Sequence, residues 1–441
     1  MQNLILNPTL KRSIVQSAEW SREGSLEPRW QYPQQTESGG RPLKVVMVAA
    51  CPLPSPRGTP IRILRMAEAL CERGHEVHIV TYHLGGGEVN PSLKMHRTIP
   101  LGWYRDESPG PTWTKLFLMD PLLVMKLRGL LTRFDPDVVH AHHYEGLIVA
   151  KIALGLRKIP LIYDAHTMLD TELPLYGFVG SAWLSRKIGA FIDRRLPPMA
   201  DHVVAVTETI RDRFVKSGII PPGVITVVTN GVEPEMFSDP EAVEGTSIEP
   251  GRNVIFTGNV AAYQGLDLLL KAFRKVIDRS TDSRLVIATD KEFSAFEPIE
   301  KQAYDLGVRE NVDFIATNGM KHLRELLSRA DVAVNPRTKC DGIPQKLLNY
   351  MAAGKAVVSF EGSAPIIRNG VTGITVPNGD VLGFGENILD LFKNVSLRHR
   401  LGKNAREYVK ENLSWDKVAM TMEKINFDMI TDFSLGARIK A

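Results

Sequence analysis

The chain of 441 residues is 44% hydrophobic and 24% charged, an ordinary globular composition with enough length for two or three domains. No apolar run approaches the roughly 18 to 20 residues that span a bilayer, which excludes an integral membrane protein. The 54 basic residues nearly balance the 50 acidic ones, so the charge argues against a nucleic-acid partner but is compatible with docking on an anionic surface.

The opening segment and the cysteines bear on the compartment. MQNLILNPTLKRS lacks the apolar block of roughly 7 to 15 residues that a secretory signal contains, so we expect a cytoplasmic protein. The cysteines Cys51, Cys71 and Cys340 form no C-x-x-C pair and no Cys/His zinc spacing. We therefore expect neither a disulfide framework nor a structural metal.

Changes in composition divide the chain into five parts. Residues 1–43 have no hydrophobic periodicity and are expected to form a loosely ordered extension, after which residues 44–232 form a first α/β domain. Residues 233–252 are acidic and interrupted by Pro and Gly, which is typical of a linker. A second α/β domain over 253–410 and a helical tail over 411–441 complete the chain.

The first domain begins with a β-α-β pattern. An apolar strand over 44–50 is followed by a helix whose apolar side chains share one face and then by a second strand over 75–82. Thr59 is expected to cap this helix, and Gly74 lies just past its end. The alternation restarts at residue 253, so we predict an α/β fold of two doubly wound, Rossmann-like domains that face a central cleft.

Ligands of open parallel sheets bind beyond the carboxyl ends of the strands, so residues just after each strand are candidate contacts. Gly58 and Thr59 lie at a helix start that favours an anion, although a plain turn and cap explain them equally well. His142 at the end of one strand, and Asp164 and His166 after the next, are candidates to bind a substrate hydroxyl or phosphate. A packing role is the alternative for each of them. No G-x-G-x-x-G string follows a strand, which argues against a dinucleotide dehydrogenase.

The densest signal in the second domain is the segment NPRTKCDGIPQKLLNYMAAGKAVV. Asp341 and Gly342 lie in its loop and Pro344 is expected to open a helix, so the amides near Gly342 and Ile343 would point at a pyrophosphate. Lys346 adds a positive charge in the first turn of this helix. The segment therefore predicts an anion site.

Two further residues of this domain are candidate ligand contacts. Asn349 lies in an otherwise apolar helix, where a polar group is costly unless it has a partner or faces a cleft. Gly258 follows the first strand, where a glycine lets the backbone approach a ligand closely, although a plain turn is a fair alternative.

In the order and spacing of its motifs the chain resembles the retaining, nucleotide-sugar-dependent glycosyltransferases of family 4, which have the GT-B fold. The resemblance spans about residues 44–428 and is carried by an ordered series of segments. They are RGTPIRILRMAEALCERGHEVHIVTY, DVVHAHH, ADHVVAVTETIRDRF, VVTNGVEPEMF, VIFTGNVAAYQGLDLLLKAF and DGIPQKLLNYMAAGKAVVS with NGVTGITVPNGD. Each segment is weak evidence alone, but the series is specific.

The resemblance implies a donor bound mainly by the second domain, an acceptor held mainly by the first, and transfer with retained anomeric configuration and no bound metal or other cofactor. Gly58 matches the glycine loop near the phosphates, and His142 matches a histidine at the donor sugar. Asp341 falls where the first of two glutamates is expected, with Gly342 and Ile343 supplying amides.

Three residues depart from the pattern of this family. Asn349 replaces the second glutamate, and Asn259 and Gln264 replace the Arg and Lys that usually grip the pyrophosphate. Because a leaving diphosphate needs its growing charge neutralised, the departures predict a slow enzyme unless other cations take over. We hypothesise that Lys346 and Arg337 do so, since a P-x-K arrangement is similar to that of a recurrent branch of the family.

These features predict transfer of a sugar from a nucleotide-sugar donor to a hydroxyl of a glycan or lipid-linked acceptor, as in cell-surface polysaccharide biosynthesis. The segment over 110–133 combines Trp, Phe and Leu with basic residues and resembles a helix that lies peripherally on the inner face of an anionic membrane. Core packing is an equal alternative for this segment. A nucleotide-sugar epimerase and a non-catalytic, sugar-nucleotide-binding scaffold are the alternative functions.

Overall fold

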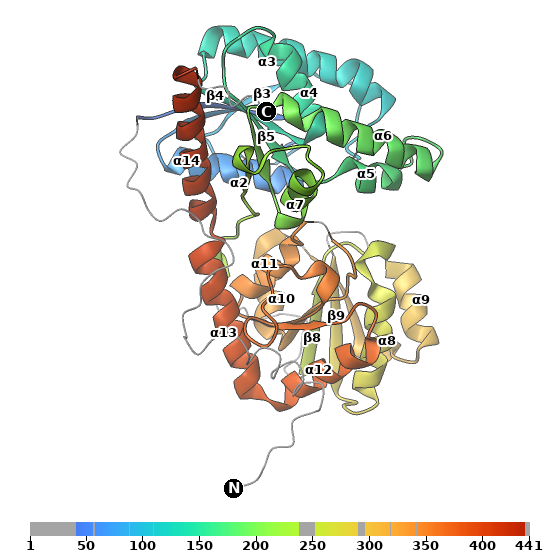
Figure 1. Ribbon diagram of the computed structural model, residues 1–441. Helices are drawn as coiled ribbons and strands as arrows, with labels where there is room; N and C mark the ends of the chain where they lie inside the picture. The colour runs from blue at the N-terminus through green and yellow to red at the C-terminus, as the bar shows by residue number, and fades with distance from the viewer. Residues whose placement is uncertain are drawn as a thin grey trace. The chain divides into compact units, whose positions relative to one another are not determined.

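The computed structural model describes residues 41–55, 58–87, 89–108, 110–237, 252–289, 296–317, 319–340 and 342–436. It comprises two compact units, which are described separately (Figure 1). The first unit contains residues 41–231 together with 415–436, and the second contains residues 232–414. The extension predicted over 1–43 and the linker predicted over 233–252 lie largely outside the described residues.

The first unit is built on a seven-stranded sheet in the order β3-β2-β1-β4-β5-β6-β7, and every neighbouring pair of strands is parallel. This order reverses direction between β1 and β4, as in a doubly wound fold. Its strands are β1 (Lys44–Ala49), β2 (Glu76–Thr81), β3 (Lys94–Arg97), β4 (Val138–His142), β5 (Leu161–Ala165), β6 (His202–Ala205) and β7 (Ile225–Val227). Its helices are α2 (Gly58–Glu72), the π-helix η1 (Lys115–Met119), α3 (Asp120–Phe134), α4 (His143–Leu154), α5 (Leu169–Glu172), α6 (Ala182–Arg195), α7 (Glu208–Lys216) and α14 (Trp415–Ser434).

Both faces of this sheet are buried because alternate side chains of each strand enter different cores. Val46 and Val48 of β1 pack in a core that also contains residues of α3, α4 and α7. Val45 and Met47 pack in the opposite core, which α2 and the C-terminal helix α14 complete. The last helix of the chain is therefore part of the first unit.

The second unit has a six-stranded parallel sheet in the order β10-β9-β8-β11-β12-β13. The strands are β8 (Arg252–Thr257), β9 (Ser283–Thr289), β10 (Val312–Ala316), β11 (Val332–Asn335), β12 (Ala356–Phe360) and β13 (Ile374–Val376). The helices are α8 (Leu266–Ile277), α9 (Glu297–Asp305), α10 (Gly319–Arg329), α11 (Gln345–Ala352), α12 (Val381–Lys393) and α13 (Val395–Asn412). Each face of the sheet has its own apolar core, so the predicted α/β architecture of two doubly wound domains is confirmed.

The apolar segment over 110–133 packs mainly into the first unit. Its helices η1 and α3 bury Met119 and four of the five leucines of α3 in the core, while Trp113, Phe117 and Met125 stay exposed. None of the helices in the described ranges combines the length and the apolar character needed to cross a bilayer.

Candidate functional site

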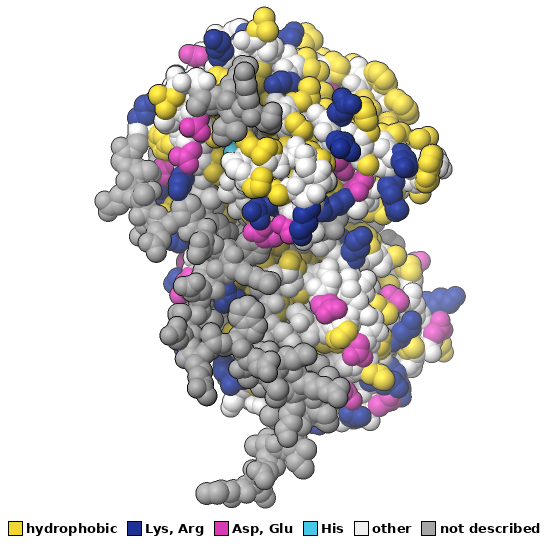
Figure 2. Space-filling view, viewed as in Figure 1, with side chains coloured by type: hydrophobic (Ala, Val, Ile, Leu, Met, Phe, Trp, Pro, Cys, Tyr) yellow, Lys and Arg dark blue, Asp and Glu magenta, His cyan; other side chains and the backbone are white. Residues whose placement is uncertain are grey.

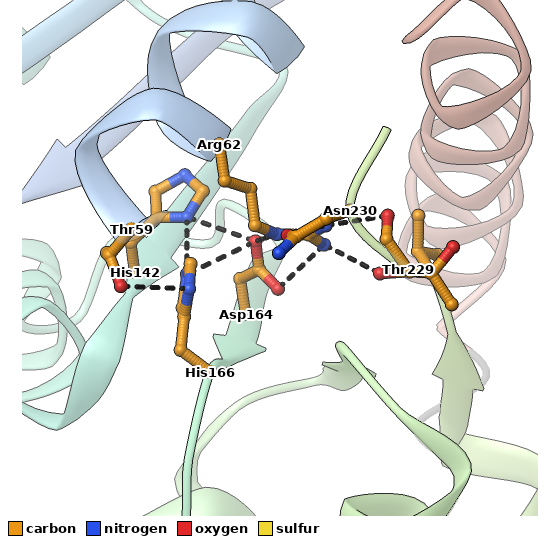
Figure 3. Close-up of polar contacts among 8 residues, drawn as sticks. Thr59, Arg62, His142, Asp164, His166, Thr229 and Asn230 are labelled. Carbon is orange, nitrogen blue, oxygen red and sulfur yellow. Dashed lines mark hydrogen bonds and ion pairs between the residues drawn. The ribbon is translucent and has the colours of Figure 1, made fainter. Parts of the chain in front are cut away.

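In the first unit, three of the predicted residues meet at the ends of two neighbouring strands. His142 ends β4 and is in register with Asp164 of β5, so their side chains lie side by side. His142 Nδ1 lies 3.1 Å from Asp164 Oδ2, and His166 Nε2 lies 3.5 Å from the same oxygen (Figure 3). The sequence predicted each residue separately, and the sheet brings them together.

Arg62 of α2 completes this group, and sequence reasoning did not single it out. Its guanidinium donates to both carboxylate oxygens of Asp164, at 2.9 and 3.1 Å, and to the backbone oxygens of Val228 and Thr229 (Figure 3). Both side chains of the ion pair are only 1% exposed. The sequence contained one signal of this pairing. Arg62 lies four residues before Met66 on the apolar face of the helix, and a charged residue on an apolar face indicates a buried partner.

The ion pair sets the charge of this cluster. Burial by itself would raise the pKa of Asp164, but the positive charge of Arg62 and the hydrogen bond from His142 hold the pKa well below its usual value. Burial lowers the pKa of His166 well below its usual value, so this imidazole is neutral at pH 7. The cluster therefore contains an ionised carboxylate that accepts hydrogen bonds from Arg62.

The carboxylate also determines which nitrogen of His142 carries a proton. Because Asp164 is ionised, it accepts a hydrogen bond from Nδ1–H of His142, and in this tautomer Nε2 is the acceptor nitrogen of the ring. Nε2 is buried and has no hydrogen-bond partner among the described residues. His140, two residues earlier, differs because its Nε2 lies 2.7 Å from Asn426 of α14. His142 can thus accept a hydrogen bond from a ligand hydroxyl, whereas His140 contacts helix α14.

Gly58 and Thr59 lie in the first turn of α2. The expectation that Thr59 caps this helix is wrong, because the chain is already helical at Gly58. The Thr59 hydroxyl instead lies 3.4 Å from His166 Nδ1. A side chain added at Gly58 would meet no atom of the described residues within 4 Å.

In the second unit, the side chains of Lys346 and Gln264 meet although they lie far apart in the sequence. Lys346 of α11 donates from Nζ to Gln264 Oε1 at 2.8 Å, and Nζ lies 3.8 Å from the centre of the Phe256 ring. A Cβ atom built on Gly258, whose φ is +125°, would lie 3.2 Å from the same Nζ. The amine therefore lies where the chain leaves β8.

The surroundings of the Lys346 amine disfavour its positive charge. Burial lowers the pKa of its amine well below the usual value, and the nearby charge of Arg337 lowers it further. Within the described ranges, no Asp or Glu side chain forms an ion pair with this amine. A positive charge at this half-buried position is costly without a counterion, so an anionic ligand would be a favourable partner for the protonated amine.

The other candidates that follow β8 and β11 are linked to this amine. Gln264 donates to Asn259 Oδ1 at 3.1 Å, and Asn259 donates to the Tyr263 hydroxyl at 2.8 Å. The guanidinium of Arg337 lies 4.9 Å from the centre of the Tyr263 ring. The two residues that replace the expected cations, Asn259 and Gln264, thus connect Lys346 to Arg337 through side chains.

The loop before α11 is only partly described. Asp341 lies outside the described residues. A side chain added at Gly342 would meet nothing within 4 Å, Ile343 is buried in the core, and Pro344 is the N-cap residue of α11. Asn349 lies on α11 at a half-buried position, one turn after Lys346.

Comparison with known proteins identifies the family. Residues 56–236 match the family described as Glycosyltransferase Family 4, and residues 240–408 match Glycosyl transferases group 1, which together cover most of the chain. The chain belongs to the family 4 type of glycosyltransferases. This agrees with the resemblance found in the sequence, and a transferase follows from it.

A curated glycosyltransferase and two solved structures align with this chain over nearly their whole length. An uncharacterized glycosyltransferase of Methanocaldococcus jannaschii is 26% identical, over 85% of this chain and 95% of its own. The structure of a sucrose-phosphate synthase from Thermosynechococcus elongatus has a TM-score of 0.73 at 16% identity, over 88% of this chain and 99% of its own. The Anabaena protein HepE, solved with UDP and glucose, has a TM-score of 0.66 at 14% identity, over 87% of this chain and 99% of its own.

Proposed function

We propose that this glycosyltransferase moves a sugar from a nucleotide-sugar donor to a hydroxyl of a glycan or glycolipid in cell-surface polysaccharide biosynthesis. The observation that carries the proposal is the position of Lys346 Nζ, 2.8 Å from the side chain of Gln264. Family members usually have cations after this strand, and here an amine from α11 reaches the same place. HepE was solved in complex with UDP, which supports the choice of donor class.

In this proposal Lys346 and Arg337 neutralise the diphosphate as it leaves. The amides before α11 and the positive end of the helix dipole add to this charge. A diphosphate would supply the counterion that Lys346 lacks, and would thereby raise the pKa of the amine on binding. Each such contact is worth about 2 to 4 kcal/mol of barrier lowering.

We propose that the configuration at the anomeric carbon is retained. The bond between this carbon and the phosphate oxygen breaks, and a bond from the acceptor oxygen forms on the same face of the sugar. The departing phosphate oxygen takes the acceptor's proton, so the protein supplies geometry rather than a base. His142 would accept a hydrogen bond from a sugar hydroxyl through Nε2, because its Nδ1–H is donated to Asp164.

We also propose that no metal takes part. His142, Asp164 and His166 offer ligand atoms that lie within 4.8 Å of one another. Both oxygens of Asp164, however, accept hydrogen bonds from Arg62, whose positive charge lies where a bound cation would be repelled. This arrangement favours a salt bridge over a metal centre. Activity should therefore survive treatment with EDTA.

A thermal-shift panel of nucleoside diphosphates and nucleotide sugars tests the donor site, because a ligand that prefers the folded state raises the unfolding temperature. We expect one nucleotide to stabilise the wild type and the control Lys403→Met, which alters a lysine that is 75% exposed on α13. Lys346→Met should abolish this shift. Without ligand, its unfolding temperature should be unchanged or higher, because the substitution removes an amine whose positive charge is disfavoured by its surroundings.

With the donor identified, turnover on acceptor extracts distinguishes the functions. Lys346→Met should lower turnover by roughly 30- to 1000-fold, and the linkage of the product should match that of the donor in NMR spectra. Isomerisation of the donor without an acceptor would assign an epimerase instead. Binding of the nucleotide with no transfer to any extract would assign a non-catalytic scaffold.

We also propose that the enzyme is cytoplasmic and makes peripheral contact with the inner face of an anionic membrane. The segment over 110–133 supplies at most Trp113, Phe117 and Met125 to this contact, because its other large apolar residues are mainly buried.

A further inference from the structure

Helix α6 of the first unit turns its small and polar residues inward and its large apolar residues outward. Its buried residues are Ser185, Gly189 and Asp193, spaced one turn apart. Trp183 and Phe191 are 68% and 61% exposed. Ile188 and Ile192 at the flanks of the inner stripe are partly buried against the core. This pattern is the reverse of that of an ordinary surface helix.

Polar contacts and close packing hold the helix in place. The Asp193 carboxylate accepts the backbone amides of Leu169 and Asp170 at 2.9 and 3.0 Å, and also accepts from the Tyr144 hydroxyl. A Cβ atom at Gly189 would lie 2.4 Å from the backbone oxygen of Leu169, so only glycine permits this approach. The outer face of α6 is therefore not needed to dock the helix on its own unit.

This outer face carries cations interleaved with the aromatic rings. Arg186, Lys187, Arg194 and Arg195 are all exposed, and in the described ranges none of them forms an ion pair. Lys187 Nζ lies 5.8 Å from the Trp183 ring, and the Arg195 guanidinium lies 5.4 Å from the Phe191 ring. The single acid of the helix, Asp193, is buried. The outer face is therefore apolar and positively charged.

A second group of aromatic side chains precedes the helix. Trp113 stacks on Phe117 with ring centres 5.7 Å apart and contacts Phe178 at 4.8 Å. Phe178 lies just before Ser181, the N-cap of α6. Leu175, in the same connection, is 79% exposed. Figure 2 shows hydrophobic and basic side chains intermingled over the part of the first unit that carries α6 in Figure 1.

We infer that the outer face of α6 docks on an anionic lipid bilayer. Exposed tryptophan and phenylalanine insert favourably at the level of the headgroups, and arginine and lysine reach anionic phosphates while their stems lie on apolar surface. The four exposed cations of α6, which form no ion pair within the described residues, favour binding to a negatively charged surface. The inference deepens the proposed function, since a docked unit would receive an acceptor carried by lipid.

Flotation with vesicles tests the inference in the absence of any nucleotide. The full chain should bind vesicles of phosphatidylcholine with about 30% phosphatidylglycerol, and bind phosphatidylcholine alone far less. Arg194→Glu with Arg195→Glu should weaken binding by at least about 30-fold, because each cation contributes about fivefold. Trp183→Ser with Phe191→Ser should weaken it by a similar factor.

A control variant changes one cation and one aromatic residue on another helix. Lys301→Glu with Tyr304→Ser alters exposed positions of α9 in the second unit and should bind vesicles like the wild type. Quenching of fluorescence by brominated lipid should fall in Trp183→Phe, which keeps an aromatic ring and the fold. Unfolding temperatures of all variants should match that of the wild type.

The outcomes separate this inference from the donor site. Equal binding by the wild type and both α6 variants would overturn it, as would equal binding to the two kinds of vesicle. Self-association that the α6 variants abolish, without vesicle binding, would assign the face to a second copy and also overturn it. The nucleotide-dependent thermal shift should persist in the α6 variants, whereas failure of the proposed function would remove that shift from the wild type.

Discussion

Replacing Arg62 by Met would leave the charge of Asp164 buried without its partner. The wild-type guanidinium makes two bonds to this carboxylate and two to backbone oxygens, and both side chains are 1% exposed. Removal of one member of such a pair costs about 3 to 5 kcal/mol. For a unit of this size the loss corresponds to a fall of roughly 6 to 20 °C in the unfolding temperature.

The matched control lies one turn further along the same helix. Arg65 pairs with Glu68 at 2.9 Å, but these side chains are 36% and 18% exposed, so Arg65→Met should cost less than about 1 kcal/mol. Calorimetry of both variants would resolve the difference. Arg62→Lys should recover little, because an ammonium cannot make the bidentate contact. Equal unfolding temperatures for Arg62→Met and Arg65→Met would refute the assignment of a tightly coupled buried pair.

Two further predictions concern the histidines of the first unit. Asp164→Asn should donate an amide proton to His142 Nδ1 and move the ring proton to Nε2, which ¹⁵N NMR would detect as a change of tautomer together with lost turnover; an unchanged tautomer would contradict the proposed role of the carboxylate. Burial lowers the pKa of His140 to about 4, whereas the unfolded chain titrates near 6.5. Protonation between these values favours unfolding, so the free energy of unfolding should fall by ~2 kcal/mol from pH 7 to pH 5, and His140→Gln should lack this part of the loss.

Much of the fold was readable because buried parallel strands and amphipathic helices leave different periods in the sequence. The β-α-β unit from Lys44 to Thr81 and the helix that follows Pro344 lie where the pattern predicts them. The hydrophobic pattern does not show which side chains contact one another, however. Strand alternation places His140 and His142 on the same side, and only the contact with Asn426, 286 residues away, distinguishes them.

The candidate site shows the same limit. The ends of strands and the start of a helix led to the predictions of His142 and Lys346, but Arg62 was missed. Helical periodicity describes where apolar residues face and not which buried cation meets which acid. Helix α6 was missed for a related reason. An analysis that assigns apolar residues to the core cannot find a helix that is held by Asp193 and exposes its tryptophan.

The position of α14 has a consequence for biosynthesis. One face of the first sheet is covered by α2 and by α14, which is made after the whole second unit and includes Trp415, whose ring lies against Gly231. During translation the part of this face that α14 covers stays exposed while about 180 residues of the second unit emerge. A nascent chain of this protein therefore exposes apolar residues of its first sheet until α14 has been made. Holdase chaperones should bind the chain during this time.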